Sequence, residues 1–169
     1  NGERVGTGKG PQCDIAVDPI DGTTLTAEGR NNALSVLAVA DRGAMLDAST
    51  VFYMDKLVTG PAGVGVVDIR LPIGENIRRL AKSLVKPVDE MVVSVLNRPR
   101  HAQLIEDIRD AGAGTRLMSD GDVAGGINAA VGGANVLGIL AATAQGPLAS
   151  LLHNEELLVR IVGHAAIGC

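Results

Sequence analysis

The sequence predicts a protein of the α/β class, folded as an α/β or α+β layered sandwich. Short apolar runs of strand length alternate along the chain with segments whose apolar residues recur at helical spacing. The connections between these segments are short, and no internal repeat interrupts them. With 169 residues, 46% of them hydrophobic, the chain is long enough for one domain with a real core but short for two.

The first half of the chain is expected to consist mainly of strands. A glycine-rich lead over residues 1–11 comes first. Strands are predicted over residues 14–18, 33–40, 51–58 and 64–69. The turn at Asp41-Arg42-Gly43 indicates that the strands on either side of it pair as a hairpin.

The second half is expected to alternate helices and strands. Helices are predicted over residues 75–85, 101–111 and 123–131, and strands over residues 91–96 and 115–118. In the first of these helices, one face carries Ile77, Leu80, Ala81 and Leu84. Helices and strands in this order predict a sheet covered by helices.

Composition argues against several classes of function. The formal net charge of −4 does not suit a general nucleic-acid surface, and with Phe52 and Tyr53 as the only aromatic residues there is no platform for stacking bases. Cys13 and Cys169, near opposite ends, indicate neither a disulfide framework nor a zinc site. No apolar run approaches the roughly 20 residues of a membrane helix. We therefore expect a cytoplasmic protein with no nucleic-acid or membrane partner.

The most informative segment is a heptad with two carboxylates three residues apart. It follows an apolar strand candidate and reads Asp18-Pro19-Ile20-Asp21-Gly22-Thr23-Thr24. Pro19 and Gly22 favour a tight turn that lets both carboxylates and the Thr23 hydroxyl point into one small volume. Mg²⁺ and similar cations prefer such oxygen ligands. An ordinary Asp-Gly turn followed by a helix cap is the alternative, and the complete heptad favours a metal site.

Several sequence blocks resemble class II fructose-1,6-bisphosphatases of the bacterial GlpX type, which belong to the lithium-sensitive phosphomonoesterase superfamily. The resemblance rests on the heptad and on the blocks Asn32 to Asp41, Phe52 to Leu57, Arg98 to His101 and Asp120 to Ala124, which stand in the family's order with family-like spacing. It implies a sugar-phosphatase-like core over residues 1–131. Residues 132–169 are expected to form a divergent C-terminal tail, in which an amphipathic helix is predicted by the spacing of Leu151, Leu152, Leu157, Leu158 and Ile161. The family's upstream segment, with two further acidic metal ligands, is missing, so the chain looks truncated.

The resemblance assigns roles to the heptad. It implies that Asp18 and Asp21 ligate Mg²⁺ or Mn²⁺, that Asp21 and Thr23 are catalytic, with Thr23 orienting or deprotonating a water, and that Asp21, Gly22 and Thr23 contact substrate. Tyr53 matches a family tyrosine that contacts substrate. On its own, Tyr53 reads equally as a half-buried strand residue.

Two further blocks are expected to bind substrate. In Arg98-Pro99-Arg100, two guanidinium groups precede a helix. Their spacing alone fits a phosphate-binding site and a solvent-exposed charged turn equally well. In Asp120-Gly121-Asp122, the simpler interpretation of the residues is that Asp122 caps the following helix. The resemblance implies substrate contacts for both blocks. His101, by contrast, is expected to cap or pack.

The predicted function is divalent-metal-dependent hydrolysis of the 1-phosphate of fructose 1,6-bisphosphate to fructose 6-phosphate, a step of gluconeogenesis. Two alternatives stay open: a related sedoheptulose-bisphosphatase or inositol-phosphatase activity, and a catalytically impaired fragment that binds a sugar phosphate or a partner. We expect the protein to form a homo-oligomer.

Overall fold

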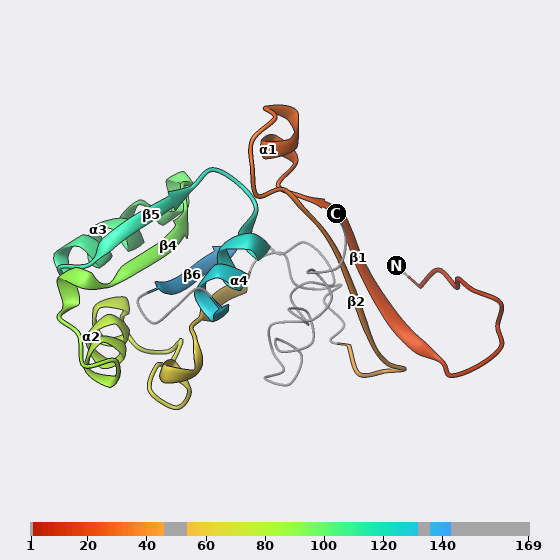
Figure 1. Ribbon diagram of the computed structural model, residues 1–169, viewed down its shortest axis with the longest axis horizontal. Helices are drawn as coiled ribbons and strands as arrows, with labels where there is room; N and C mark the ends of the chain where they lie inside the picture. Colours follow the sequence, from red (N-terminus) through yellow and green to blue (C-terminus); the bar gives the residue numbers. More distant parts are fainter. Residues whose placement is uncertain (1, 46–53, 132–135, 143–169) are drawn as a thin grey trace.

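The structure of the chain is a computed structural model that describes residues 2–45, 54–131 and 136–142. Within these ranges the chain forms a helix-covered sheet and a separate two-stranded ribbon (Figure 1). The α/β class predicted from the sequence is confirmed.

A four-stranded sheet forms the centre of the helix-covered part. Its strands lie in the order β3 (Met54–Val58), β6 (Val136–Ala142), β4 (Val92–Leu96) and β5 (Gly114–Met118). β6, β4 and β5 run parallel, and β3 is antiparallel to β6. The carboxyl ends of β4 and β5 therefore meet at one edge of the sheet, the place where ligands commonly bind in parallel sheets.

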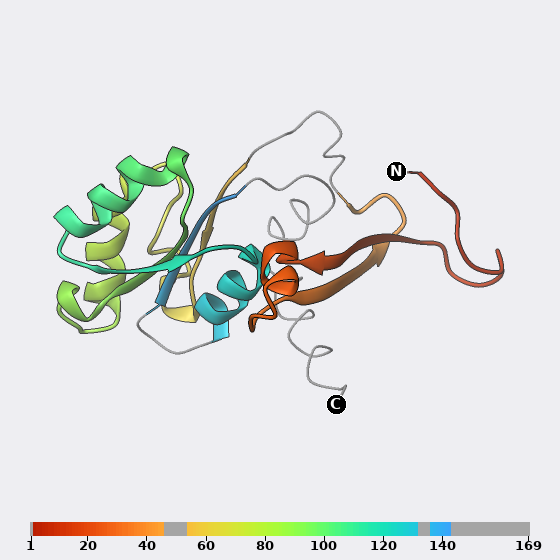
Figure 2. The same cartoon turned by 90° about the horizontal axis from the view of Figure 1, so that it is seen from above.

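Helices cover both faces of this sheet. α2 (Ile73–Ser83) and α3 (Ala102–Asp110) lie together on one face, and α4 (Asp122–Val131) lies on the other (Figure 2). In the described ranges, no helix combines the length and the apolar character needed to cross a membrane.

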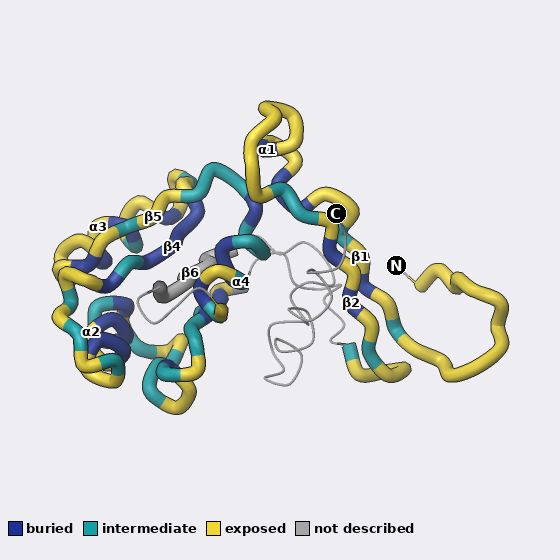
Figure 3. The backbone as a smooth tube through the Cα atoms, in the orientation of Figure 1, coloured by how far each residue is buried: buried dark blue, intermediate teal, exposed yellow. Residues whose placement is uncertain are grey.

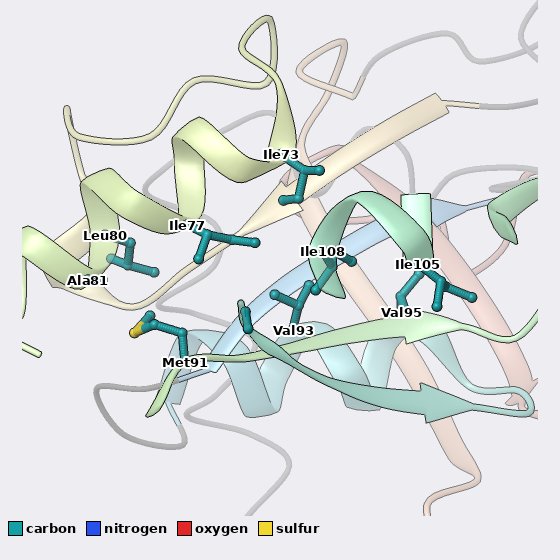
Figure 4. Close-up of a cluster of buried hydrophobic side chains, with 10 residues drawn as sticks. Ile73, Ile77, Leu80, Ala81, Met91, Val93, Val95, Ile105 and Ile108 are labelled. Atoms are coloured by element: carbon teal, nitrogen blue, oxygen red, sulfur yellow. The ribbon is translucent and has the colours of Figure 1, made fainter. Parts of the chain in front are cut away.

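The main core lies between α2, α3 and β4. Figure 4 shows side chains from these three elements pointing toward one another, and Ile77, Val93, Val95 and Ile108 are completely buried. Each such aliphatic side chain contributes roughly 1.5–3 kcal/mol through burial. Val93 and Val95 face this core because alternate residues of a strand point to the same side.

The ribbon pairs β1 (Cys13–Asp21) with β2 (Leu34–Asp41) in antiparallel fashion, and the short helix α1 (Thr23–Ala27) follows β1. One face of the ribbon exposes the cross-strand pairs Ile15–Val39 and Val17–Leu37, each of these side chains being at least 44% accessible. Figure 3 shows burial concentrated on β4 and the inner sides of its helices, whereas residues 2–13 are exposed.

Two expectations about individual elements are wrong. Residues 64–69 form turns instead of a strand, because Gly65 takes a positive φ of 70° and Val66 and Val67 both donate to the Gly63 carbonyl. The expected hairpin around residues 41–43 does not form in the described ranges, since β2 pairs with β1 and β3 pairs with β6.

In the divergent tail that begins at residue 132, the expected amphipathic helix rests on Leu151 to Ile161, which lie outside the described residues. The part of the tail that the structure describes, residues 136–142, is strand β6, which lies between β3 and β4. The rest of that segment lies outside the described residues.

Candidate functional site

The two acids of the heptad are brought together by an irregularity in β1. The strand does not end at Asp18 as expected but continues to Asp21. Asp18 pairs with Val36 and Asp21 pairs with Leu34, so β1 has one extra residue over this stretch, which makes a β-bulge. Residues three apart on a regular strand point to opposite faces, and the extra residue turns these two toward the same face. Pro19, which cannot donate to the ladder, sits in the bulge, where proline is tolerated.

The turn after Asp21 depends on Gly22. Its φ of 88° and ψ of 52° lie in the left-handed region. The backbone then enters α1, so Thr23 is the exposed first residue of that helix. Asp21 is 8% accessible and Asp18 is half-buried, whereas Pro19 and Ile20 between them are exposed.

The heptad docks on the turn that joins β5 to α4, about a hundred residues further along the chain. The Asp120 Oδ2 atom accepts a hydrogen bond from the Thr24 N–H at 2.9 Å, and the Asp21 Oδ2 atom accepts one from the Val123 N–H at 3.2 Å. Each Asp-Gly turn thus supplies a carboxylate to the first turn of the other's helix. This reciprocal exchange satisfies backbone donors that a helix start leaves unpaired.

The two turns approach so closely because each contains glycine at the contact. A Cβ atom added at Gly22 would lie 3.0 Å from the Leu25 Cδ1 atom and 3.5 Å from the Gly121 Cα atom. One added at Gly121, whose φ is 78°, would lie 3.2 Å from the Asn32 carbonyl oxygen. The cap expected of Asp122 on the following helix is not seen, because Asp122 is the first residue of α4 and its carboxylate pairs with Lys56. Asp120 instead accepts a hydrogen bond from the first turn of α1.

Two cations accompany this turn. Arg98 follows β4 and its Nη2 atom lies 3.4 Å from the Asp120 Oδ1 atom, a contact allowed by the parallel pairing of β4 and β5. Lys56, from the middle of β3, places its Nζ atom 3.2 Å from the Asp122 Oδ2 atom. Partial burial acts to raise the pKa of Asp120. Hydrogen bonds from Thr24 and Gly121 and the charge of Arg98 outweigh this effect and hold the pKa below its ordinary value.

The charge on the heptad is not balanced in the same way. No lysine, arginine or histidine among the described residues forms an ion pair with Asp18 or Asp21. Burial, followed by the charge of Asp122, raises the pKa of Asp21 from 3.8 to about 7 even though the Val123 hydrogen bond opposes the rise. Two carboxylates that have no cationic partner among the described residues, one of them buried, fit a divalent cation.

These two acids do not form a complete metal cage. In the described ranges, no group of three or more His, Cys, Asp or Glu side chains is placed to hold a metal ion. Mg²⁺ commonly uses one or two carboxylates and takes its other ligands from water and substrate phosphate. The donor set therefore suits a cation shared with a phosphate ligand.

The other predicted site residues are distributed as follows. Pro99 and Arg100 are exposed in a short 3-10 helix, Pro99–His101, and Tyr53 lies outside the described residues. His101 is 2% accessible, and its Nδ1 atom lies 2.7 Å from the Leu96 carbonyl oxygen, which agrees with the expected packing role.

Sequence reasoning missed Lys56. In β3, Lys56 and Val58 are buried, whereas Asp55 is exposed and Leu57 is only partly buried, so the lysine occupies the inward face of the strand. The signal in the sequence was the strand alternation, which places Lys56 on the same face as Val58. A lysine on a buried face needs an acidic partner.

The acidic turn of the heptad and the Asp-Gly-Asp turn thus dock on each other beside the carboxyl ends of the parallel strands β4 and β5. A model of the family described as bacterial fructose-1,6-bisphosphatase, glpX-encoded, matches residues 1–149, and the chain belongs to this family. This match confirms the resemblance to the class II enzymes and continues beyond residue 131, where the sequence suggested that the core ends.

Curated relatives agree with the family match. The chain is 48% identical over 126 residues to fructose-1,6-bisphosphatase 1 class 2 of Escherichia coli K12. The same identity over the same length relates it to fructose-1,6-bisphosphatase class 2 of Shigella flexneri. In both cases the matched region is 75% of this chain and 37% of the relative, so the chain spans little more than a third of these relatives.

Proposed function

We propose that this chain carries the substrate-holding part, and two metal ligands, of a phosphatase that hydrolyses the 1-phosphate of fructose 1,6-bisphosphate. Fructose 6-phosphate and inorganic phosphate are the products, and gluconeogenesis is the pathway implied by the family. The names of the relatives support the substrate. Because the chain spans little more than a third of these relatives, the activity of the whole protein is part of the proposal.

The observation that carries the proposal is the docking of the heptad on the Asp-Gly-Asp turn. Hydrogen bonds between Thr24 and Asp120 and between Asp21 and Val123 join a candidate metal turn to a candidate sugar-binding turn. Arg98 stands beside the same contact, 3.4 Å from Asp120. A sugar bisphosphate needs a cation at one phosphate and positively charged side chains at the other, and both kinds of group meet here.

The proposed cofactor is Mg²⁺ or Mn²⁺, held by Asp18 and Asp21. When bound, such an ion supplies positive charge against the phosphoryl oxygens and makes water more acidic. Both carboxylates have to be ionised to ligate it. The Val123 N–H helps because it donates to Asp21 and so favours the charged form.

The remaining residues bind and orient in this proposal. Thr23, exposed at the start of α1, directs its hydroxyl at the attacking water. Arg98 and Arg100, with Pro99 stiffening the backbone between them, bind the second phosphate. Gly22 and Gly121 contribute their backbones to the proposed substrate contacts, and their lack of a side chain lets the two turns pack together. Tyr53, Asp120 and Asp122 complete the proposed sugar contacts.

A second candidate function is a catalytically impaired module that binds a sugar phosphate or a partner. It is favoured by the absence, in the described ranges, of a group of three or more acidic, histidine or cysteine ligands. Hydrolysis of sedoheptulose bisphosphate or an inositol phosphate by the same site is a third candidate.

Two predictions about the protein's surroundings remain part of the proposal. We expect association between copies, because Ile15, Val17, Leu37 and Val39 form an exposed apolar face on the ribbon. Light scattering of the purified chain measures this directly. We expect a cytoplasmic location, where sugar phosphates are metabolised.

Phosphate release from fructose 1,6-bisphosphate in Mn²⁺ or Mg²⁺ tests the main proposal, with EDTA as the metal-free control. Asp18→Asn should abolish release while the circular dichroism spectrum stays unchanged. Asp55→Asn, an exposed acid on β3, is the matched control and should retain wild-type turnover.

The outcomes separate the candidates. Release from the bisphosphate that stops in EDTA supports the phosphatase. Binding of fructose 1,6-bisphosphate without release supports the impaired module. Faster release from sedoheptulose bisphosphate or inositol phosphate supports the third candidate. Wild-type turnover in Asp18→Asn would refute the assignment of the metal turn.

A further inference from the structure

Lys56 is a buried cation that the proposed reaction does not use. Its side chain is 6% accessible and its Nζ atom lies 3.2 Å from the Asp122 Oδ2 atom, which is itself in a side chain only 17% accessible. Burying a lysine to this degree is costly unless it is paired. The pair ties the centre of β3 to the first residue of α4.

The pair acts on a site with four carboxylates. Two of them have cationic partners among the described residues: Asp120 has Arg98 and Asp122 has Lys56. The other two, Asp18 and Asp21, are those that fit a divalent cation. Among the described residues, lysine and arginine thus neutralise two of the four negative charges, and the other two are left for an ion.

Asp122 stands close to the pair reserved for the ion. The residue next to it, Val123, donates its N–H to the Asp21 Oδ2 atom at 3.2 Å. The charge of Asp122 also acts on the Asp21 carboxylate, so these two side chains are near each other. Because Lys56 engages the Asp122 Oδ2 atom, it holds that carboxylate toward β3.

We propose that Lys56 is a positioning residue that keeps Asp122 from becoming a third carboxylate ligand of the metal. This inference rests on the proposed metal site at Asp18 and Asp21. Its functional meaning is a compromise: a third carboxylate strengthens the hold on the cation, but the extra negative charge repels the phosphate that has to bind there.

The test is Mn²⁺ binding to the full chain, measured by the electron paramagnetic resonance signal of free Mn²⁺. Lys56→Met removes the charge and keeps the length of the side chain. We expect it to bind Mn²⁺ at least about tenfold more tightly than wild type, because a freed carboxylate acts on a doubly charged ion at short range. Inorganic phosphate, titrated in the presence of Mn²⁺, should bind more weakly.

Three variants serve as controls. Lys56→Arg keeps the charge and should restore wild-type binding of both Mn²⁺ and phosphate. Lys82→Met makes the same chemical change at an exposed position of α2 and should have no effect on either. Lys56→Met combined with Asp122→Asn removes the freed ligand, so its Mn²⁺ affinity should return to the wild-type value.

A purely structural role for Lys56 predicts the opposite change in Mn²⁺ affinity. A site merely loosened by Lys56→Met would bind Mn²⁺ more weakly, and that result, or unchanged affinity, overturns the proposal. The absence of Mn²⁺ binding in both wild type and Lys56→Met overturns it too.

If Lys56→Met does not fold, the Asp122→Asn variant tests the proposal instead. It leaves Lys56 unpaired and should weaken Mn²⁺ binding, and unaltered binding counts against the proposal. These measurements are independent of turnover, so an inactive chain that binds Mn²⁺ as described refutes the phosphatase alone.

Discussion

Replacing Gly22 with alanine tests whether the heptad and the Asp-Gly-Asp turn are docked as described. Gly22 has a φ of 88°, a conformation that costs an ordinary residue roughly 1–2 kcal/mol. The new Cβ atom would also lie 3.0 Å from the Leu25 Cδ1 atom and 3.5 Å from the Gly121 Cα atom. Leu25 is only 5% accessible and has little room to move, so overpacking adds about 1–2 kcal/mol.

Gly43→Ala is the matched control. Gly43 has a similar φ of 82°, but a Cβ atom there would meet no atom within 4 Å. The Gly43→Ala variant therefore has the same backbone strain as Gly22→Ala but no steric contact with a neighbouring atom. We expect Gly22→Ala to lower the free energy of unfolding by about 2–4 kcal/mol and Gly43→Ala by about 1–2 kcal/mol.

Urea denaturation followed by circular dichroism measures both losses. In a thermal scan, 1 kcal/mol corresponds to roughly 2–4 °C for a chain of this size. Gly22→Ala should also weaken Mn²⁺ binding, whereas Gly43→Ala should not. Equal losses of stability in the two variants would refute the docking of the two turns.

Three other perturbations have expected outcomes. In EDTA, burial and neighbouring carboxylates raise the pKa of Asp21 to about 7, so the folded chain keeps a proton that the unfolded chain loses. Stability should therefore fall as the pH rises from about 4 to about 7, and thermal scans of Asp21→Asn over this range should show a flatter dependence. Asp120→Ala removes the acceptor for the Thr24 N–H and the partner of Arg98, and urea denaturation should show a loss of about 1–2 kcal/mol. Ile77→Ala, at a completely buried core position, should cost about 2–5 kcal/mol while the Mn²⁺ affinity of the folded fraction stays at the wild-type value.

The sequence predicts the helices and strands that form the core, because the apolar spacing that identifies each of them lies within its own segment. The apolar residues of α2 recur at helical spacing, and Ile77 and Leu80 are buried as expected. Residues 136–142 were harder. An apolar run of this length suits a buried strand and a helix equally, and pairing with β3 and β4 decides between them.

The candidate site was predictable in its residue types but not in its connections. Asp18 and Asp21 identify the acidic turn from the sequence, yet the bulge that turns them to one face depends on pairing with β2. The hydrogen bonds that Asp21 and Asp120 accept from Val123 and Thr24 join segments about a hundred residues apart, and no local sequence pattern predicts them. The partner of Lys56 is hidden for the same reason.

An anomalous difference map from crystals of this chain soaked in Mn²⁺ addresses the central claim most directly. We expect one strong peak within coordination distance of carboxylate oxygens of both Asp18 and Asp21, with Asp122 still held by Lys56. A map without a peak at these two acids, or with the ion bound at another part of the chain, would contradict the account.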